Sequence, residues 1–317
     1  MKIVVLDGFA MNPGDLNWDS LKQLGETEIY ERSFLKETAD RISNAEIVLT
    51  NKAILNKELI DGAKKLKYIG VMATGYNIVD IVAAQTKDIV VTNVPFYSTA
   101  SVAQLTFALI LELANHTALY AESVRDGDWI KSNDFSYHLK PIMELRDKTL
   151  GVIGLGQIGQ AVAKIAIAFG MKVIASHKHP ERDQMEGVTF VDEKTSFREA
   201  DIVSLHCPLN EKNTKFVNKE LLAIMKPTAF LINTSRGGLI NEPDLAEALN
   251  KETIAGAALD VLSTEPPVAS NPLLQAKNCL ITPHIAWATF EARSRLMSVV
   301  VNNIKSFLEG KVEHVVK

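Results

Sequence analysis

The sequence predicts an α/β protein with two doubly wound parallel-sheet domains, and three observations lead to this fold class. The chain has 317 residues, about twice the roughly 150 residues that one hydrophobic core usually serves. Short β-branched runs alternate with polar stretches that suit helices, a pattern typical of parallel sheets covered on both faces. A long apolar helix interrupts this alternation once, after which it resumes.

The first hundred residues alternate between expected strands and helices. Strands are expected over residues 2–7, 27–31, 46–50, 67–71 and 88–92, with helical segments near residues 16–24, 34–44, 57–64 and 78–87. At the end of the chain, residues 289–308 have helical spacing and cannot add a strand to a second sheet. We expect this helix to return to the first domain, which then spans residues 1–100 and 289–317.

The interrupting helix begins near Ser101, where Ser101 and Gln104 have the spacing of a capping box. Apolar side chains fall on every side of it, namely Leu105, Phe107, Leu109, Ile110, Leu111 and Leu113. We expect the helix to be buried all round, between domains or between the two subunits of a homodimer. The alternative is an ordinary core helix in a monomer.

The second domain is expected to span residues 101–288. Its strands are predicted over residues 149–153, 172–175, 201–205, 229–233, 254–260 and 279–282.

Composition excludes several classes of protein. Hydrophobic residues make up 47% and charged residues 23% of the chain, and the net charge is −4, which favours a globular protein over a disordered or fibrous one. The chain has no run of Lys and Arg long enough to favour nucleic acid as a partner. No apolar run approaches the ~18 residues of a membrane span, and the first residues do not resemble a signal peptide. We expect a cytoplasmic protein with neither nucleic acid nor membrane as a partner.

The two cysteines, Cys207 and Cys279, are too few and too far apart for a disulfide framework or a zinc site. Both lie in apolar, strand-like surroundings. We expect buried, reduced thiols and no metal site.

A glycine-rich turn follows the strand at residues 149–153 and opens a helix near residues 161–169. It contains Gly154, Gly156 and Gly159 at the spacing of the dinucleotide fingerprint. The first glycine permits a tight turn, the second lets a pyrophosphate approach the backbone, and the third lets helix and strand pack closely. The helix N-terminus then offers N–H groups to the anion, so the turn predicts a dinucleotide site.

The end of the next strand lacks the Asp or Glu that usually binds the ribose hydroxyls of NAD. His177, Lys178 and His179 stand there instead. Without a carboxylate nothing repels a 2′-phosphate, and these side chains could attract one. We expect NAD as the cofactor, with measurable use of NADPH. The alternative interpretation of this stretch is a solvated turn.

Arg236, Glu265 and His284 each follow a predicted strand of the second domain. Ligands of open α/β sheets bind at the carboxyl ends of strands, so these side chains are expected to converge there. Reduction of a 2-keto acid needs a cation for the carboxylate, a proton donor for the developing alkoxide and a group that orients the donor. Arg236 can grip a carboxylate bidentately, His284 can donate the proton and Glu265 can hold its ring.

Seven stretches of the chain together resemble one family. They are VMATGYNIVD, VTNVPFYSTASVAQ, TLGVIGLGQIGQ, DIVSLHCPLN, MKPTAFLINTSRGGLI, AALDVLSTEPP and ITPHIAWAT. In order and spacing they are similar to the D-isomer-specific 2-hydroxyacid dehydrogenases, in particular to the glycerate dehydrogenase (hydroxypyruvate reductase) branch. The resemblance covers nearly the whole chain.

The resemblance implies a flavodoxin-like substrate domain and a Rossmann NAD(P)-binding domain, with the active site in a cleft between them. It implies an NAD(P)-dependent oxidoreductase that transfers a hydride between the nicotinamide and a small D-2-hydroxy acid or 2-keto acid, first glycerate and hydroxypyruvate and also glyoxylate. In this family Arg236 would bind substrate, Glu265 would orient the histidine and His284 would be the acid/base.

The resemblance also implies further contacts with the cofactor and the substrate. Cofactor contacts would come from Gly154, Gly156, Gln157, Ile158 and Gly159 at the pyrophosphate, His177 and Lys178 at the ribose end, Cys207 and Pro208 near the ribose, and Thr234, Ser235, Arg236, Asp260 and His284 around the nicotinamide. Substrate contacts would come from the backbone of Ala73, Thr74 and Gly75 and from Ser101, Arg236, His284 and Trp287.

The chain departs from the family pattern at two positions. Gln104 stands where a glutamate is common, and His177 replaces the acidic ribose contact. Two alternatives stay open: a non-catalytic dinucleotide-sensing protein, because corepressors that resemble this family keep the same three polar residues, and a sibling dehydrogenase of lactate or phosphoglycerate.

Overall fold

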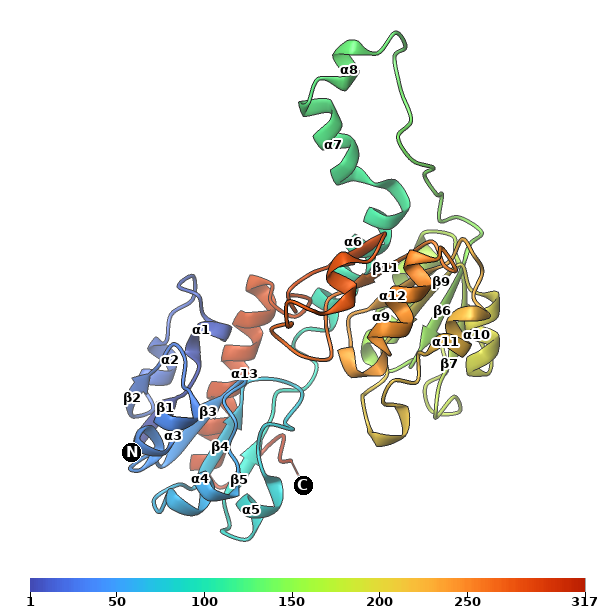
Figure 1. Cartoon of the computed structure of the whole chain (residues 1–317). Coiled ribbons are helices and arrows are strands. Elements are labelled where there is room, and N and C mark those ends of the chain that lie inside the picture. Colours follow the sequence, from blue (N-terminus) through green and yellow to red (C-terminus); the bar gives the residue numbers. More distant parts are fainter. Residues whose placement is uncertain (317) are drawn as a thin grey trace. The chain divides into compact units, whose positions relative to one another are not determined.

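The computed structural model describes residues 1–316. The chain forms two compact units, one made of Met1–Ser98 with the segment from Ala288 onward and the other of Thr99–Trp287 (Figure 1). Each unit contains one sheet in which every paired strand runs parallel to its neighbour. The predicted fold class, two doubly wound parallel-sheet domains, is confirmed.

The first unit has a five-stranded sheet of order β2-β1-β3-β4-β5. Its strands are β1 (Lys2–Val5), β2 (Glu26–Ile29), β3 (Ile47–Thr50), β4 (Tyr68–Val71) and β5 (Val90–Thr92), and its shorter helices are α1 (Gly8–Met11), α2 (Asp19–Lys22), α3 (Leu35–Ile42), α4 (Lys57–Gly62) and α5 (Ile81–Gln85). Strands β3 and β4 are buried along their whole length, as expected for strands covered on both faces. The strand order reverses between β1 and β3, which marks the edge where such sheets bind ligands.

The C-terminal helix α13 (Phe290–Leu308) belongs to this first unit. The side chain of Thr289 caps it by accepting a hydrogen bond from the N–H of Ala292. Leu296, Val300 and Ile304 lie on one face and are at most 2% exposed. Helical spacing of apolar residues therefore buries one stripe of α13 against the unit.

The second unit has a seven-stranded sheet of order β12-β11-β10-β9-β6-β7-β8. Its strands are β6 (Thr149–Ile153), β7 (Lys172–Ser176), β8 (Val188–Phe190), β9 (Ile202–Leu205), β10 (Phe230–Asn233), β11 (Gly256–Leu259) and β12 (Cys279–Ile281). The sequence analysis missed β8, a three-residue edge strand that is not fully buried and has little apolar pattern. The order reverses between β6 and β9, next to the glycine-rich turn.

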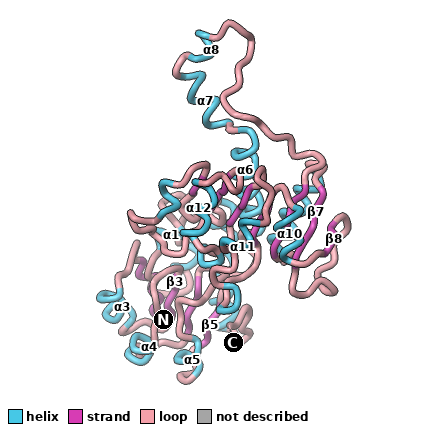
Figure 2. Tube along the Cα trace, turned by 45° about the vertical axis from the view of Figure 1, so that its right-hand side comes forward, coloured by secondary structure: helices cyan, strands magenta, loops and turns pink. Residues whose placement is uncertain are grey.

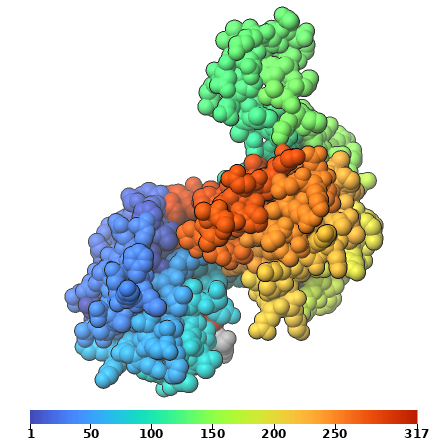
Figure 3. All heavy atoms as spheres, viewed as in Figure 1, coloured from blue at the N-terminus to red at the C-terminus, as the bar shows by residue number. Residues whose placement is uncertain are grey.

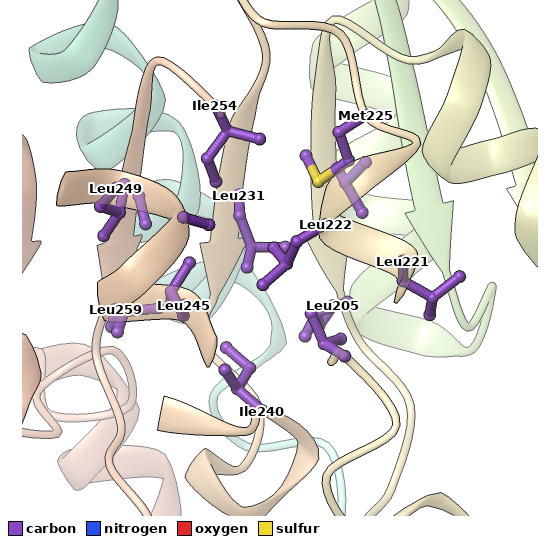
Figure 4. Close-up of a cluster of buried hydrophobic side chains, with 14 of the residues drawn as sticks. Leu205, Leu221, Leu222, Met225, Leu231, Ile240, Leu245, Leu249, Ile254 and Leu259 are labelled. Atoms are coloured by element: carbon purple, nitrogen blue, oxygen red, sulfur yellow. The ribbon is translucent and has the colours of Figure 1, made fainter. Parts of the chain in front are cut away.

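Helices and short 3₁₀ turns complete this unit. The helices are α6 (Thr99–Asn115), α7 (Thr117–Arg125), α8 (Asp128–Lys131), α9 (Gln157–Ala168), α10 (Glu193–Glu199), α11 (Lys219–Ala223) and α12 (Glu242–Asn250), and the 3₁₀ turns are η1 (Glu211–Asn213), η2 (Gly237–Leu239) and η3 (Pro272–Gln275). Successive side chains of β10 enter different cores, because a strand points alternate residues to opposite faces. Leu231 packs in the core of Figure 4, whereas Ile232 packs in the core that contains residues of α6 and α9.

The long apolar helix differs from its prediction in one respect. It breaks at His116, whose φ of 52° is left-handed, and α7 continues at 57° to α6. Ala100, Gln104 and Ala108 of α6 are exposed in one chain, so burial all round stays a prediction that needs a second subunit to cover this face. These residues are four apart and share one face of the helix. Among residues 1–316, no single helix is long and apolar enough to span a membrane.

Segments α7 and α8, with the chain that returns to residue 144, form an arm that stands away from the rest of the second unit (Figures 2 and 3). We call residues 117–144 the arm. Its internal contacts are mainly polar: Ser123 Oγ bonds to Asp128 Oδ2 at 2.7 Å, and the hydroxyl of Tyr120 donates to the carbonyl of Lys140 at 3.0 Å. The arm has no apolar core of its own, because Ser123 is the buried residue of α7 and α8 has none.

The core of the second unit makes a stability prediction. Leu231 is 0% exposed, and its side chain lies beside that of Leu222 in this core (Figure 4). Leu231→Ala should therefore lower the free energy of unfolding, measured by urea denaturation, by about 2–5 kcal/mol, through lost burial and the cavity it leaves. The control Leu274→Ala, at a residue 40% exposed, should change it by less than about 0.5 kcal/mol. Equal effects of the two variants would contradict this packing.

Candidate active site

The glycine-rich turn between β6 and α9 has the geometry of a cradle. Gly154 has a φ of +98°, and a Cβ there would lie 2.8 Å from the backbone nitrogen of Cys207. A Cβ at Gly159 would lie 2.2 Å from the carbonyl oxygen of Gly154. A Cβ at Gly156, in contrast, would meet no atom of the described residues within 4 Å. Two glycines permit close backbone packing, and the third faces open space where a ligand can approach.

Helix α9 begins at this open space. It has 12 residues, and its N-cap residue is Gly156, which has no side chain to cap the helix. The first N–H groups of a helix have no partner inside the helix, and with the helix dipole they favour an anion. The turn, the open face of Gly156 and the uncapped helix therefore fit the pyrophosphate of a dinucleotide cofactor, with Gln157 and Ile158 supplying the nearest backbone.

His177 lies directly after β7 and contacts the glycine-rich turn. Its Nδ1 accepts a hydrogen bond from the N–H of Leu155 at 3.0 Å, and its Nε2 lies 2.7 Å from Asp183 Oδ2. Asp183 also accepts hydrogen bonds from Arg182, from Nε at 3.0 Å and from Nη2 at 2.5 Å. Arg182 and then His177 hold the pKa of Asp183 at about 2, so this carboxyl is ionised at neutral pH.

Asp183 corrects one premise of the sequence analysis. The end of β7 carries no carboxylate in sequence, yet the fold brings one to His177 from six residues further along the chain. Sequence reasoning missed it because Asp183 lies in an irregular segment with no periodicity to place its side chain. The stretch HPERD does contain paired charges, which is the one signal that could have drawn attention to it.

The ends of β9 and β10 are tied together beside the turn. Ser235 Oγ donates to the carbonyl of Cys207 at 2.7 Å, and Thr234 Oγ1 lies 3.0 Å from the hydroxyl of Thr106 in α6. Asn213 Nδ2 donates to the carbonyl of Pro208 at 2.8 Å. Burial raises the pKa of the Cys207 thiol to about 11, so the thiol is protonated at neutral pH. These contacts order the edge where the predicted nicotinamide and ribose contacts lie.

Arg236 lies in the short loop after β10, and hydrogen bonds hold this loop. Asn233 Nδ2 donates to the carbonyl of Arg236 at 2.9 Å. The exposed Arg236 side chain donates from Nη1 to the carbonyl of Ser235 at 2.8 Å. The next residue, Gly237, lies so close to the following loop that a Cβ would fall 1.9 Å from the carbonyl carbon of Leu262. This glycine therefore lets the Arg236 loop rest on the loop that leads to Glu265.

Glu265 and His284 form a direct pair. His284 Nδ1 lies 2.6 Å from Glu265 Oε2, and Glu265 Oε1 accepts a hydrogen bond from the N–H of Leu262 at 3.0 Å. With Nδ1 directed at the carboxylate, Nε2 is the ring atom left to exchange a proton with a ligand. His284 has a φ of +55°, a conformation that costs a non-glycine residue energy and is concentrated at functional sites.

Asp260 holds the segment that carries His284. It is 1% exposed, and its carboxylate accepts hydrogen bonds from Thr282 Oγ1 at 2.6 Å, from the N–H of Ile285 at 2.9 Å and from the N–H of Ala286 at 2.8 Å. Burial raises the pKa of Asp260, while these three donors act in the opposite direction. The backbone N–H of His284 also bonds to the carbonyl of Asp260 at 2.8 Å.

Two predicted substrate residues lie beside this segment. Ser101 Oγ donates to the carbonyl of Ala286 at 2.6 Å, and Trp287 follows Ala286 in the chain and is half-buried. The loop of Ala73, Thr74 and Gly75 follows β4 in the first unit. It is tied to the segment after β5 through the N–H of Val94, which donates to the carbonyl of Ala73 at 3.0 Å.

The second unit thus brings Glu265 and His284 into direct contact and places the Arg236 loop against the Glu265 loop. All three residues follow strands of one parallel sheet at their carboxyl ends, next to the cradle that fits a dinucleotide. A cation, an oriented imidazole and a cofactor cradle at one edge are the set of groups that a 2-keto acid reductase needs.

Comparisons with known proteins agree with this chemistry. Residues 107–286 match the family model described as D-isomer specific 2-hydroxyacid dehydrogenase, NAD binding domain. The chain is 46% identical over 321 residues to a hydroxypyruvate reductase of Blautia hydrogenotrophica, covering 100% of this chain and 99% of that protein. It is 39% identical over 295 residues to a glycerate dehydrogenase of Methylorubrum extorquens, covering 92% of each.

The fold has close counterparts among solved structures. An acyclic imino acid reductase in complex with NADPH and D-Arg superposes with a TM-score of 0.87 and 34% identity, covering 100% of both chains. The resemblance seen in the sequence motifs is confirmed. The chain belongs to the D-isomer specific 2-hydroxyacid dehydrogenase family and binds a nicotinamide dinucleotide.

Proposed function

We propose that this protein reduces a small 2-keto acid to the D-2-hydroxy acid, and catalyses the reverse oxidation, with hydroxypyruvate and glycerate as the main pair and glyoxylate as a further substrate. The hydrogen bond of 2.6 Å between His284 and Glu265, at a sheet edge that fits a dinucleotide, is the observation that carries the proposal. The printed functions of the two relatives, hydroxypyruvate reductase and glycerate dehydrogenase, support the choice of substrate.

Each polar residue has a distinct role in this proposal. Arg236 binds the carboxylate or the carbonyl oxygen of the substrate and stabilises the charge that develops on that oxygen. His284 donates a proton from Nε2 to the alkoxide, and Glu265 holds the ring and stabilises its protonated form. The bound nicotinamide supplies the hydride. From the family resemblance, the backbone of Ala73 to Gly75 receives the substrate carboxylate, and Ser101 and Trp287 shape the pocket.

The cofactor is proposed to be NADH, with NADPH also accepted, because no acid directly follows β7 and the carboxylate of Asp183 that the fold brings there is paired with Arg182. The NADPH in the imino acid reductase structure is consistent with this breadth. A location in the cytoplasm stays a prediction from the sequence. A non-catalytic dinucleotide sensor would keep the same three residues, and turnover separates the two functions.

Substitutions at the histidine pair test the proposed roles. His284→Gln should lower kcat by about 10²–10⁴-fold, the usual contribution of general acid catalysis. The dissociation constant of NADH, measured by fluorescence titration, should change far less, because the other predicted cofactor contacts remain. Glu265→Gln should lower kcat less, because the ring keeps a hydrogen-bonding partner. The control Glu220→Gln, which removes a carboxylate from an exposed position of α11, should leave kcat unchanged. Near-normal kcat of His284→Gln on every 2-keto acid would refute the assignment.

A substrate panel tests the proposed activity. Hydroxypyruvate and glyoxylate should give higher kcat/KM than pyruvate or 3-phosphohydroxypyruvate, because relatives 46% and 39% identical to the chain are named hydroxypyruvate reductase and glyoxylate reductase. The rate with NADPH should exceed a hundredth of the rate with NADH at equal concentrations. No turnover with any member of the panel would favour the sensor function. A preference for pyruvate or the phosphorylated acid would favour a sibling dehydrogenase.

We further propose that the protein is a homodimer formed through α6 and the arm. Ile130 and Phe135 at the end of the arm are 89% and 90% exposed, and Trp129 is 51% exposed. Such an apolar surface is costly in water. Helix α6, which leads into the arm, presents the exposed stripe of Ala100, Gln104 and Ala108. A second copy of the chain would cover both surfaces by a two-fold, self-complementary contact.

Charged substitutions on the arm test the dimer. Sedimentation of the wild type should give twice the chain mass, and the double variant Ile130→Asp with Phe135→Asp should sediment as a monomer or with a dissociation constant raised at least about 100-fold, because it buries two charges in the interface. Val82→Asp, at a residue 71% exposed on α5 of the other unit, is the matched control. A monomeric wild type, or a double variant that dimerises normally, would disprove this interface.

A further inference from the structure

A compact cluster of Arg182, Asp183 and His177 lies at the carboxyl end of β7. The side chains of His177 and Asp183 are 10% and 17% exposed, whereas that of Arg182 is 66% exposed. Asp183 Oδ2 lies between the other two, 2.7 Å from the imidazole and 2.5 Å from the guanidinium. The carboxylate is therefore shielded by a ring on one side and by a solvent-facing cation on the other.

The hydrogen bonds decide the protonation of His177. The N–H of Leu155 is a donor, so Nδ1 of His177 accepts at 3.0 Å and carries no hydrogen. The hydrogen of the ring must then be on Nε2, which donates it to Asp183 at 2.7 Å. Both ring nitrogens are used and the ring is neutral in this arrangement. His177 thus supplies no positive charge to a ligand, and Asp183 is the group that keeps it in this tautomer.

This cluster lies where dinucleotide-binding sheets recognise the adenosine ribose. In such sheets the residue at the end of the strand after the glycine-rich turn contacts the ribose 2′ position. His177 has this place, and its bond to Leu155 joins it to the turn itself. NADPH differs from NADH at this position by a phosphate of about −1.5 to −2 charges. The charges closest to His177 therefore bear on the choice of cofactor.

We propose that Asp183 and Arg182 form a charge pair that sets the preference between NADH and NADPH, with Asp183 also acting as the positioning residue for His177. This inference rests on the proposed use of a nicotinamide dinucleotide at the glycine-rich turn. The carboxylate of Asp183 repels a 2′-phosphate, and the guanidinium of Arg182 offsets that repulsion. Removing one member leaves the other uncompensated, so the two residues have opposite effects on selectivity.

Two charge-removing variants test the pair. Asp183→Asn keeps an oxygen that accepts from His177 Nε2 and removes the negative charge, whereas Arg182→Gln removes the positive charge. The readouts are the ratio of kcat/KM for NADPH to that for NADH, and calorimetric dissociation constants of 2′,5′-ADP and 5′-AMP, which need no turnover. Glu186→Gln is the matched control, because it removes a carboxylate from an exposed position of the same segment.

Opposite shifts are expected from the two variants. Asp183→Asn should raise the ratio of kcat/KM for NADPH to that for NADH by about 3–10-fold and lower the dissociation constant of 2′,5′-ADP by the same factor. This is the size expected for one partly solvated charge near a phosphate. Arg182→Gln should lower both by a similar factor. Neither variant should change the affinity for 5′-AMP by more than about twofold, and Glu186→Gln should change no readout.

A third variant isolates the positioning role. Asp183→Ala leaves Nε2 of His177 without its acceptor. It should therefore weaken the binding of 5′-AMP as well as change the preference between NADPH and NADH. Asp183→Asn, which keeps an acceptor, should bind 5′-AMP as the wild type does. Shifts of the same sign from Asp183→Asn and Arg182→Gln, or no shift in 2′,5′-ADP binding, would overturn the inference even if the enzyme reduces hydroxypyruvate. If the wild type binds both nucleotides and the shifts appear but no 2-keto acid is reduced, the inference stands and the proposed function fails.

Discussion

The site depends on a buried carboxylate that holds a neighbouring loop in place. Asp260 directly follows β11, and its side chain accepts hydrogen bonds from Thr282, Ile285 and Ala286, which belong to the chain after β12. Between these donors lies His284 in a left-handed conformation. A residue in this conformation persists only where the surroundings determine the backbone on both sides. The three hydrogen bonds supply that constraint, and they direct the imidazole toward Glu265.

Close backbone packing likewise holds in place the Arg236 loop, the Glu265 loop and the glycine-rich turn. Gly237 allows the Arg236 loop to touch the backbone at Leu262, and Leu262 in turn donates its N–H to Glu265. A side chain at position 237 would separate the two loops. Gly154 lets the turn after β6 pack closely on Cys207 after β9, and Gly159 lets α9 pack closely on the same turn. Position 156, in contrast, has free space around it. The turn therefore packs closely on the protein at Gly154 and Gly159 and leaves room for a ligand at Gly156.

The cluster after β7 shows that the residue type at one position does not by itself predict the local charge around that position. His177 stands where an acid is usual, yet the fold supplies Asp183 to the same place from a later segment, together with Arg182. The local field at this edge depends on all three side chains. Burial is also hard to predict from residue type alone, since the apolar side chains of Ile130 and Phe135 in the arm are 89% and 90% exposed.

The sequence by itself determined the α/β class, the parallel sheets and the glycine-rich turn, because periodicity and glycine spacing are local properties of the chain. It predicted Arg236, Glu265 and His284 as site residues from their places after strands and from the family resemblance. It did not reveal the edge strand β8, the break of the long helix at His116, or Asp183. Only the tertiary structure decided these, since each depends on contacts between segments with no repeating pattern. The bond between His284 and Glu265 is of the same kind: sequence named both residues, but loop packing set the 2.6 Å between them.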